Sequence, residues 1–153
     1  LMLLISAYDL RHKIIPNQLV YLAIAIALLS VLANSFQVSG LRFQVSYFVT
    51  NLLAGFGLFT FFAFLWLVSR GKWIGFGDAK LALAIGFMLG WPASLAAFFL
   101  AFWLGAFVGL IYKFLSGSRD FKIQLPFAAF LATAGLAAFL WGEVIIYWYL
   151  SLL

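Results

Sequence analysis

Long stretches without charged side chains are the feature that most constrains the fold. Residues 47–68 contain no charged residue, and as a helix at 1.5 Å per residue they would span about 33 Å, enough to cross the roughly 30 Å core of a bilayer. The whole chain is 67% hydrophobic and only 8% charged, whereas soluble domains are roughly half apolar and a quarter charged. The sequence therefore predicts an integral membrane protein.

Only two kinds of structure satisfy every backbone hydrogen bond inside lipid, namely helices and closed β-barrels. Barrel strands are short and alternate between apolar and polar residues, whereas the apolar runs here are long and do not alternate. The expected fold is all-α, a polytopic transmembrane helix bundle.

About six membrane segments are expected in a single domain covering residues 1–153. They are residues 1–8, 18–32, 47–68, 78–89, 93–115 and 126–153. The first would span only about 12 Å as a helix, so we expect a truncated first helix whose upstream part and domain are absent. The last is longer than one crossing requires, which allows a break near Gly142 and Glu143.

The basic residues give the expected orientation. If successive segments alternate in direction, one side carries eight basic residues and the other carries only Arg42. The eight are Arg11, Lys13, Arg70, Lys72, Lys80, Lys113, Arg119 and Lys122. Basic residues concentrate on the cytoplasmic side of membrane proteins, so this side is expected to face the cytoplasm, where anionic lipid is a suitable partner.

The residue inventory excludes several kinds of chemistry. The chain has no cysteine, and its one histidine is His12. Thiolate metal sites, histidine-rich metal clusters and a serine or cysteine nucleophile with a spare histidine are therefore excluded. We expect no metal, no cofactor and no nucleic-acid partner.

Two of the four acidic residues, Asp9 and Asp78, fall at helix ends on the expected cytoplasmic side. An acid in this position is costly and is a candidate functional residue. Two neighbouring carboxyls can share a proton, so that one activates a water molecule while the other donates to a peptide carbonyl. Taken singly, Asp78 could be an N-cap and Asp9 could pair with Arg11 or Lys13 on a solvated turn.

Two glycines precede the second acid in the segment GFGDAKLALAIGFMLG. Gly75 and Gly77 would allow the backbone freedom and close approach that a peptide substrate needs, although an ordinary flexible turn explains them too. Lys80 and Arg11 each follow an acid by two residues and do not face it on a helix, so both are expected to reach toward lipid headgroups.

These motifs resemble those of the type IV prepilin peptidases, membrane aspartic proteases of the GxGD class. DLRHKIIPNQL, residues 9–19, is similar to the first aspartate motif of the family, and GFGDAKL to the second. KIQLPFAAFLA, residues 122–132, is similar to a third block, with Leu125 and Ala128-Ala129 where the family usually has Ile and Gly-Pro. The resemblance covers essentially the whole chain, and the three motifs in the right order make it specific.

The resemblance implies that Asp9 and Asp78 are the catalytic pair, with Gly75, Gly77, Lys80 and Arg11 binding substrate or supporting the site. The implied substrate is a type IV prepilin or pseudopilin, cut after a glycine on the cytoplasmic side of the bacterial inner membrane, as in pilus assembly or type II secretion. The cysteine-bound zinc domain and the methyltransferase activity of many family members are not implied, because the chain has no cysteine.

Two other functions remain open from the sequence. A small transporter or proton channel could use the same acids as an ion relay, but it would need polar residues through the bundle, and these are sparse. A membrane scaffold without catalysis would leave the two acids far apart. The oligomeric state is not predicted.

Overall fold

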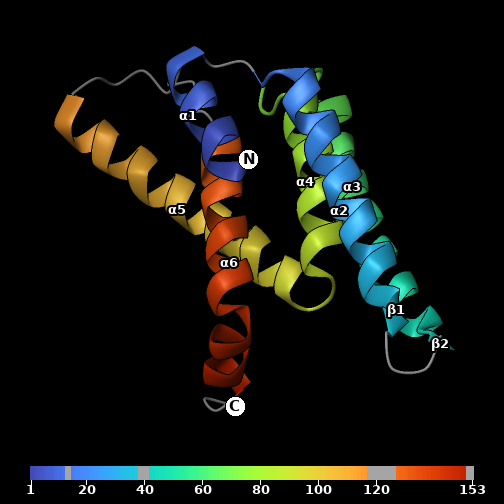
Figure 1. The fold of residues 1–153 in the computed structure, drawn as a ribbon. Helices are drawn as coiled ribbons and strands as arrows, with labels where there is room; N and C mark the ends of the chain where they lie inside the picture. Colours follow the sequence, from blue (N-terminus) through green and yellow to red (C-terminus); the bar gives the residue numbers. More distant parts are fainter. Residues whose placement is uncertain (13–14, 38–41, 117–126, 151–153) are drawn as a thin grey trace.

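The computed structural model describes residues 1–12, 15–37, 42–116 and 127–150. They form six α-helices, which confirms the all-α prediction (Figure 1). The helices are α1 (Met2–His12), α2 (Asn17–Ser35), α3 (Val45–Ser69), α4 (Phe76–Leu89), α5 (Ala93–Ser116) and α6 (Phe127–Leu150). The loop expected between the second and third segments also contains a small antiparallel pair of strands, β1 (Phe36–Gln37) and β2 (Arg42–Phe43).

Three of the described helices, α2, α3 and α5, are long and apolar enough to cross a membrane. The described apolar part of α6, Phe127–Gly142, is shorter, and α1 and α4 contain 11 and 14 residues. The protein is therefore a multi-pass membrane protein in which full crossings are combined with shorter helices.

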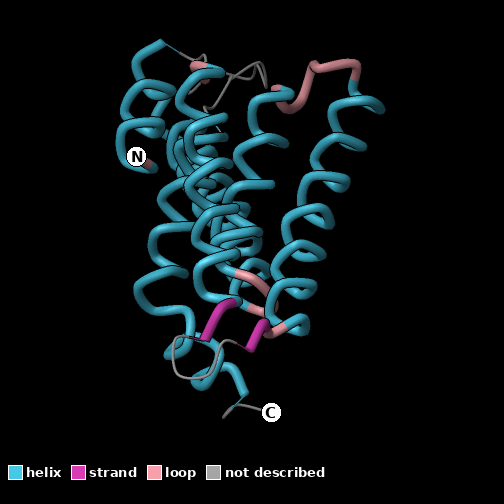
Figure 2. The backbone as a smooth tube through the Cα atoms, turned by 45° about the vertical axis from the view of Figure 1, so that its right-hand side comes forward, coloured by secondary structure: helices cyan, strands magenta, loops and turns pink. Residues whose placement is uncertain are grey.

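Successive helices alternate in direction, so the end of α1 and the starts of α2, α4 and α6 lie at one end of the bundle (Figure 1). We call this the α4-start end. The strand pair lies at the opposite end (Figure 2). The described basic residues of the predicted cytoplasmic side lie on segments at the α4-start end, and Lys13, Arg119 and Lys122 lie outside the described residues. The alternation assumed for the orientation is thus present.

Helix α4 is the central element and packs against α2, α3 and α6. Its side chains Leu81, Ala82 and Ile85 are almost completely buried. The contact with α3 is so close that a Cβ on Gly86 would lie 2.4 Å from Cα of Gly55. Small residues at a membrane helix interface permit such close approach.

Helix α6 is continuous through Gly142 and Glu143, so the break considered from the sequence is wrong. Gly142 is buried, and a Cβ added to it would lie 3.4 Å from Cβ of Ala93, at the start of α5. A glycine weakens an isolated helix. At Gly142, packing against α5 stabilises the helical conformation of α6.

Candidate functional site

Asp78 is held in the first turn of α4. Gly75 is the N-cap in an extended conformation, and its amide donates a hydrogen bond of 2.9 Å to Oδ2 of Asp78. The amide of Asp78 donates back to the carbonyl oxygen of Gly75 at 3.1 Å. The aspartate is therefore the third residue of the helix, and the alternative that Asp78 is the N-cap is wrong. Its carboxylate accepts a hydrogen bond from an N–H at the helix start that would otherwise have no partner.

Asp9 is buried near the end of α1, with 4% of its surface exposed. Its carboxyl accepts a hydrogen bond from the backbone amide of Ala129, in the first turn of α6. The Oδ2 atom is buried without a hydrogen-bond partner among the described residues. Asp9 is buried and Arg11 is exposed, so the two do not form the solvated pair considered from the sequence, and the alternative partner Lys13 lies outside the described residues.

The two carboxyls are close enough for the charge of Asp9 to act on Asp78. Asp78 is also buried, with 6% of its surface exposed. Because α6 packs against both α1 and α4, it brings together two acids that are far apart in the sequence. The structure thus buries both sequence-predicted acids at the α4-start end, within reach of each other's charge, and each carboxyl accepts a hydrogen bond from a backbone amide at the start of a helix.

The two glycines before Asp78 differ in their surroundings. Gly75 has φ −75° and ψ 149°, which any residue adopts, and an added Cβ would lie 3.4 Å from Oδ2 of Asp78. A Cβ on Gly77 would lie only 2.9 Å from Cδ1 and 3.2 Å from Cβ of Ile15. A residue without a side chain is therefore needed at Gly77 to make room for Ile15, whereas Gly75 has no such close neighbour; the substrate contact expected at the two glycines stays a prediction.

The side chain of Lys80 reaches the start of α2. Its Nζ donates hydrogen bonds of 3.0 Å to Oδ1 of Asn17 and 3.0 Å to the hydroxyl of Tyr21. The same nitrogen lies 4.8 Å from the ring centroid of Tyr21 and 5.4 Å from that of Phe76. Sequence reasoning missed Asn17 and Tyr21 as partners. The one available signal was the place of Asn17 in the IPNQ segment of the first motif.

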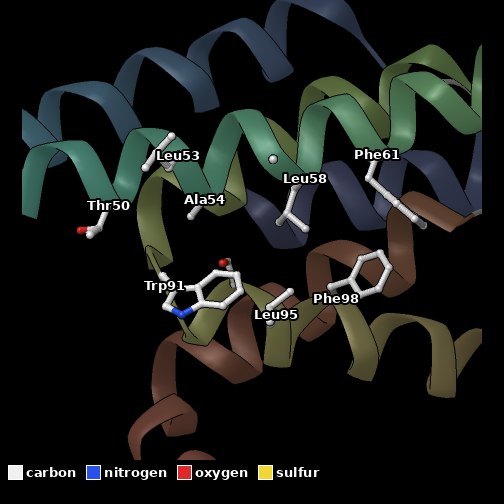
Figure 3. Close-up of a pocket in the computed structure, with 10 residues that line it drawn as sticks. Thr50, Leu53, Ala54, Leu58, Phe61, Trp91, Leu95 and Phe98 are labelled. Atoms are coloured by element: carbon white, nitrogen blue, oxygen red, sulfur yellow. The ribbon is translucent and has the colours of Figure 1, made fainter.

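A separate apolar groove runs between α3 and the start of α5 and encloses about 420 Å³. Leu58 and Phe61 of α3 face Trp91, Leu95 and Phe98 across it (Figure 3). Neither aspartate lines this groove. It offers apolar contact but no acid or base for chemistry.

Three of the sparse polar residues of the bundle bond within their own helices. Thr50 and Asn51 donate to backbone carbonyls of α3, and Thr133 donates to carbonyls of α6. Thr60 is exposed. Their hydrogen-bonding capacity is used locally, so they do not outline the polar path that an ion relay requires. Among the described residues, no group of three His, Cys, Asp or Glu side chains could hold a metal ion.

A family model for the type IV leader peptidase family matches residues 1–110. The chain belongs to this family. It is 35% identical over 147 residues to the prepilin leader peptidase/N-methyltransferase of Legionella pneumophila, an alignment that covers 94% of the chain and 48% of that relative. It is 33% identical to the protein of the same name from Bacillus subtilis (strain 168), covering 99% of the chain and 57% of the relative.

The family protein of Pseudomonas aeruginosa is 30% identical, and the alignment covers 98% of the chain and 50% of that relative. The chain thus spans about half the length of the curated relatives that it matches. No solved structure gives a significant match. The family assigned from the three sequence motifs is confirmed.

Proposed function

We propose that the chain is the catalytic membrane domain, residues 1–153, of an aspartic endopeptidase that removes the leader from type IV prepilins or pseudopilins. The observation that carries the proposal is the buried pair of Asp9 and Asp78. Membership of the type IV leader peptidase family supports the substrate class, and the printed names of the relatives refer to prepilin leaders.

The pair would act on a peptide bond through one water molecule. One carboxylate takes a proton from the water, whose oxygen adds to the carbonyl carbon, while the other carboxyl donates its proton to the carbonyl oxygen. When the tetrahedral intermediate collapses, the C–N bond breaks, the leaving amine takes a proton from one carboxyl, and a hydroxyl of the intermediate returns its proton to the other carboxylate, which restores the pair. The dyad is a coupled unit, so we assign neither acid to a single role.

The surroundings of the two carboxyls suit this chemistry. The Oδ2 atom of Asp9 has no hydrogen-bond partner among the described residues, so it is available to a water or a substrate carbonyl. Asp78 is fixed by the amide of Gly75, which limits the side-chain motion that would weaken catalysis. Burial keeps competing water away and strengthens the electrostatic interactions in the site.

The proposed location is the bacterial inner membrane with the dyad facing the cytoplasm. The basic residues at the α4-start end support this orientation. A substrate whose apolar helix lies in the membrane would present its polar leader at the level of the two acids, and the proposed cut follows a glycine at this boundary. The basic surface suits anionic lipid better than a basic leader. We propose no methyl transfer by this chain.

The test is cleavage of a purified prepilin by the purified protein, with the cut mapped by mass spectrometry. Asp9→Asn and Asp78→Asn are expected to lower the cleavage rate by about 10²–10⁴-fold or more. The remaining acids of the chain provide matched controls, and Asp120→Asn and Glu143→Gln are expected to cleave normally. Full cleavage by Asp78→Asn would refute the proposed mechanism.

A further inference from the structure

The residue Ile15, just before α2, and Asn17, the first residue of α2, each contact the first turns of α4. Ile15 lies against Gly77, as the 2.9 Å approach of a built Cβ shows. Two residues further along, Asn17 accepts a hydrogen bond from Lys80. Both contacts join the segment that follows Asp9 to the segment that carries Asp78.

These contacts matter because α1 has little other anchorage to α4. It packs mainly against α6, and its contact with α2 is small. The position of Asp9 relative to Asp78 is therefore set by α6 on one side and by the α1–α2 connection on the other. A misplacement of about 1 Å between reacting groups can cost on the order of 10²-fold in rate.

We propose that Asn17 and Lys80 form a latch that holds the α1–α2 connection against α4 and so sets the spacing of the two aspartates. They are positioning residues, because neither contacts the carboxyls in the described structure. The catalytic part of the inference rests on the proposed function, whereas the latch itself does not.

The chemistry of the contact fits a latch better than a solvated lysine. An ammonium donor makes a hydrogen bond stronger than one between neutral groups, and Lys80 makes two, to Asn17 and Tyr21. The rings of Tyr21 and Phe76 lie within cation–π distance of its Nζ. A lysine that only reaches toward lipid headgroups would have no reason to make these contacts with three residues.

The first experiment measures the latch without any substrate. The chain has no cysteine, so the variant Ile15→Cys with Gly77→Cys contains a single possible disulfide. The built Cβ of Gly77 lies 3.2 Å from Cβ of Ile15, near the range of about 3.5–4.5 Å found in disulfides. We expect rapid cross-linking under mild oxidation, detected by mass spectrometry.

Removing the latch should slow this cross-link. Asn17→Leu or Lys80→Met, added to the double-cysteine protein, is expected to lower the rate several-fold because the connection is released. The matched controls are Asn34→Leu and Lys72→Met, which change exposed residues of the same types and should leave the rate unchanged. Equal rates in the latch and control variants would overturn the inference, whatever the outcome of the cleavage assay.

The second experiment measures cleavage in the protein without added cysteines. Asn17→Leu and Lys80→Met are expected to lower kcat on the order of 10- to 100-fold, with KM and the thermal midpoint nearly unchanged. Asn17→Asp keeps an acceptor and should retain activity, and the exchange Asn17→Lys with Lys80→Asn should recover much of it. If kcat falls together with the thermal midpoint, and neither Asn17→Asp nor the exchange variant restores kcat, the contact is only structural and the positioning role is wrong.

The two experiments separate the possible failures. If the wild-type protein does not cleave prepilin, the proposed function fails, but the cross-linking rates still decide whether the latch exists. If it cleaves and the latch variants cross-link slowly yet keep full kcat, the latch exists but does not position the acids, and the catalytic part is overturned.

Discussion

Replacing Gly86 with alanine tests whether the close packing of α3 on α4 holds the central helix in place. The new Cβ would lie 2.4 Å from Cα of Gly55, 2.7 Å from its nitrogen and 2.8 Å from the carbonyl oxygen of Ala54. These are backbone atoms, which cannot rotate away. Because carbon atoms in contact normally lie about 3.5–4.0 Å apart, the two helices would have to separate by about 1 Å.

The magnitude follows from two opposing effects. Alanine favours a helix over glycine by about 1 kcal/mol, whereas overpacking a tight interface typically costs about 1–3 kcal/mol. Gly57 is a matched control on α3, since a Cβ there would meet nothing within 4 Å. Gly57→Ala should therefore show only the helix gain, and the difference between the two variants isolates the steric cost.

The assay is thermal unfolding in detergent, followed by circular dichroism. We expect Gly57→Ala to match or exceed the wild-type midpoint and Gly86→Ala to unfold about 2–12 °C below Gly57→Ala, at about 2–4 °C per kcal/mol for a chain of this size. A midpoint for Gly86→Ala equal to or above that of Gly57→Ala would refute the packing argument.

Three further predictions concern the site. Gly75→Ala should keep most cleavage activity, because Gly75 has an ordinary conformation and its amide still reaches Asp78; a loss comparable to Asp78→Asn would contradict this. Gly77→Val should lower activity several-fold by displacing Ile15, and adding Ile15→Ala should restore part of it, which the same assay checks. Arg11→Gln should change the cleavage rate less than twofold, since Arg11 is exposed, and a large loss would show that it contacts the substrate.

The sequence was sufficient to predict the helices and to single out two acids that are both buried at the α4-start end, while their catalytic role stays a prediction. Apolar runs define membrane helices directly, because lipid allows no other open structure. The segment was predicted to start at residue 78, whereas α4 starts two residues earlier, at Phe76. Aspartate is a residue type that is favoured at the N-cap, but in this helix Gly75 is the N-cap. The carboxylate of Asp78 is then free to accept the hydrogen bond from the amide of Gly75.

Tertiary contacts were beyond the sequence analysis. The hydrogen bond from Ala129 to Asp9 joins opposite ends of the chain, and no local pattern encodes it. The partners of Lys80 on α2 were missed for the same reason, since snorkelling toward lipid is the ordinary expectation for an interfacial lysine. The continuity of α6 through Gly142 likewise depends on its neighbour Ala93.

The most direct test of the central claim compares single-turnover cleavage by Asp9→Asn, Asp78→Asn and the double variant. Groups that act as a unit are not additive, so removing either one should cost about as much as removing both. We expect all three proteins to share the same residual rate. A single variant that cleaves well above the double variant would show that the substituted acid is dispensable, and the paired mechanism would be wrong.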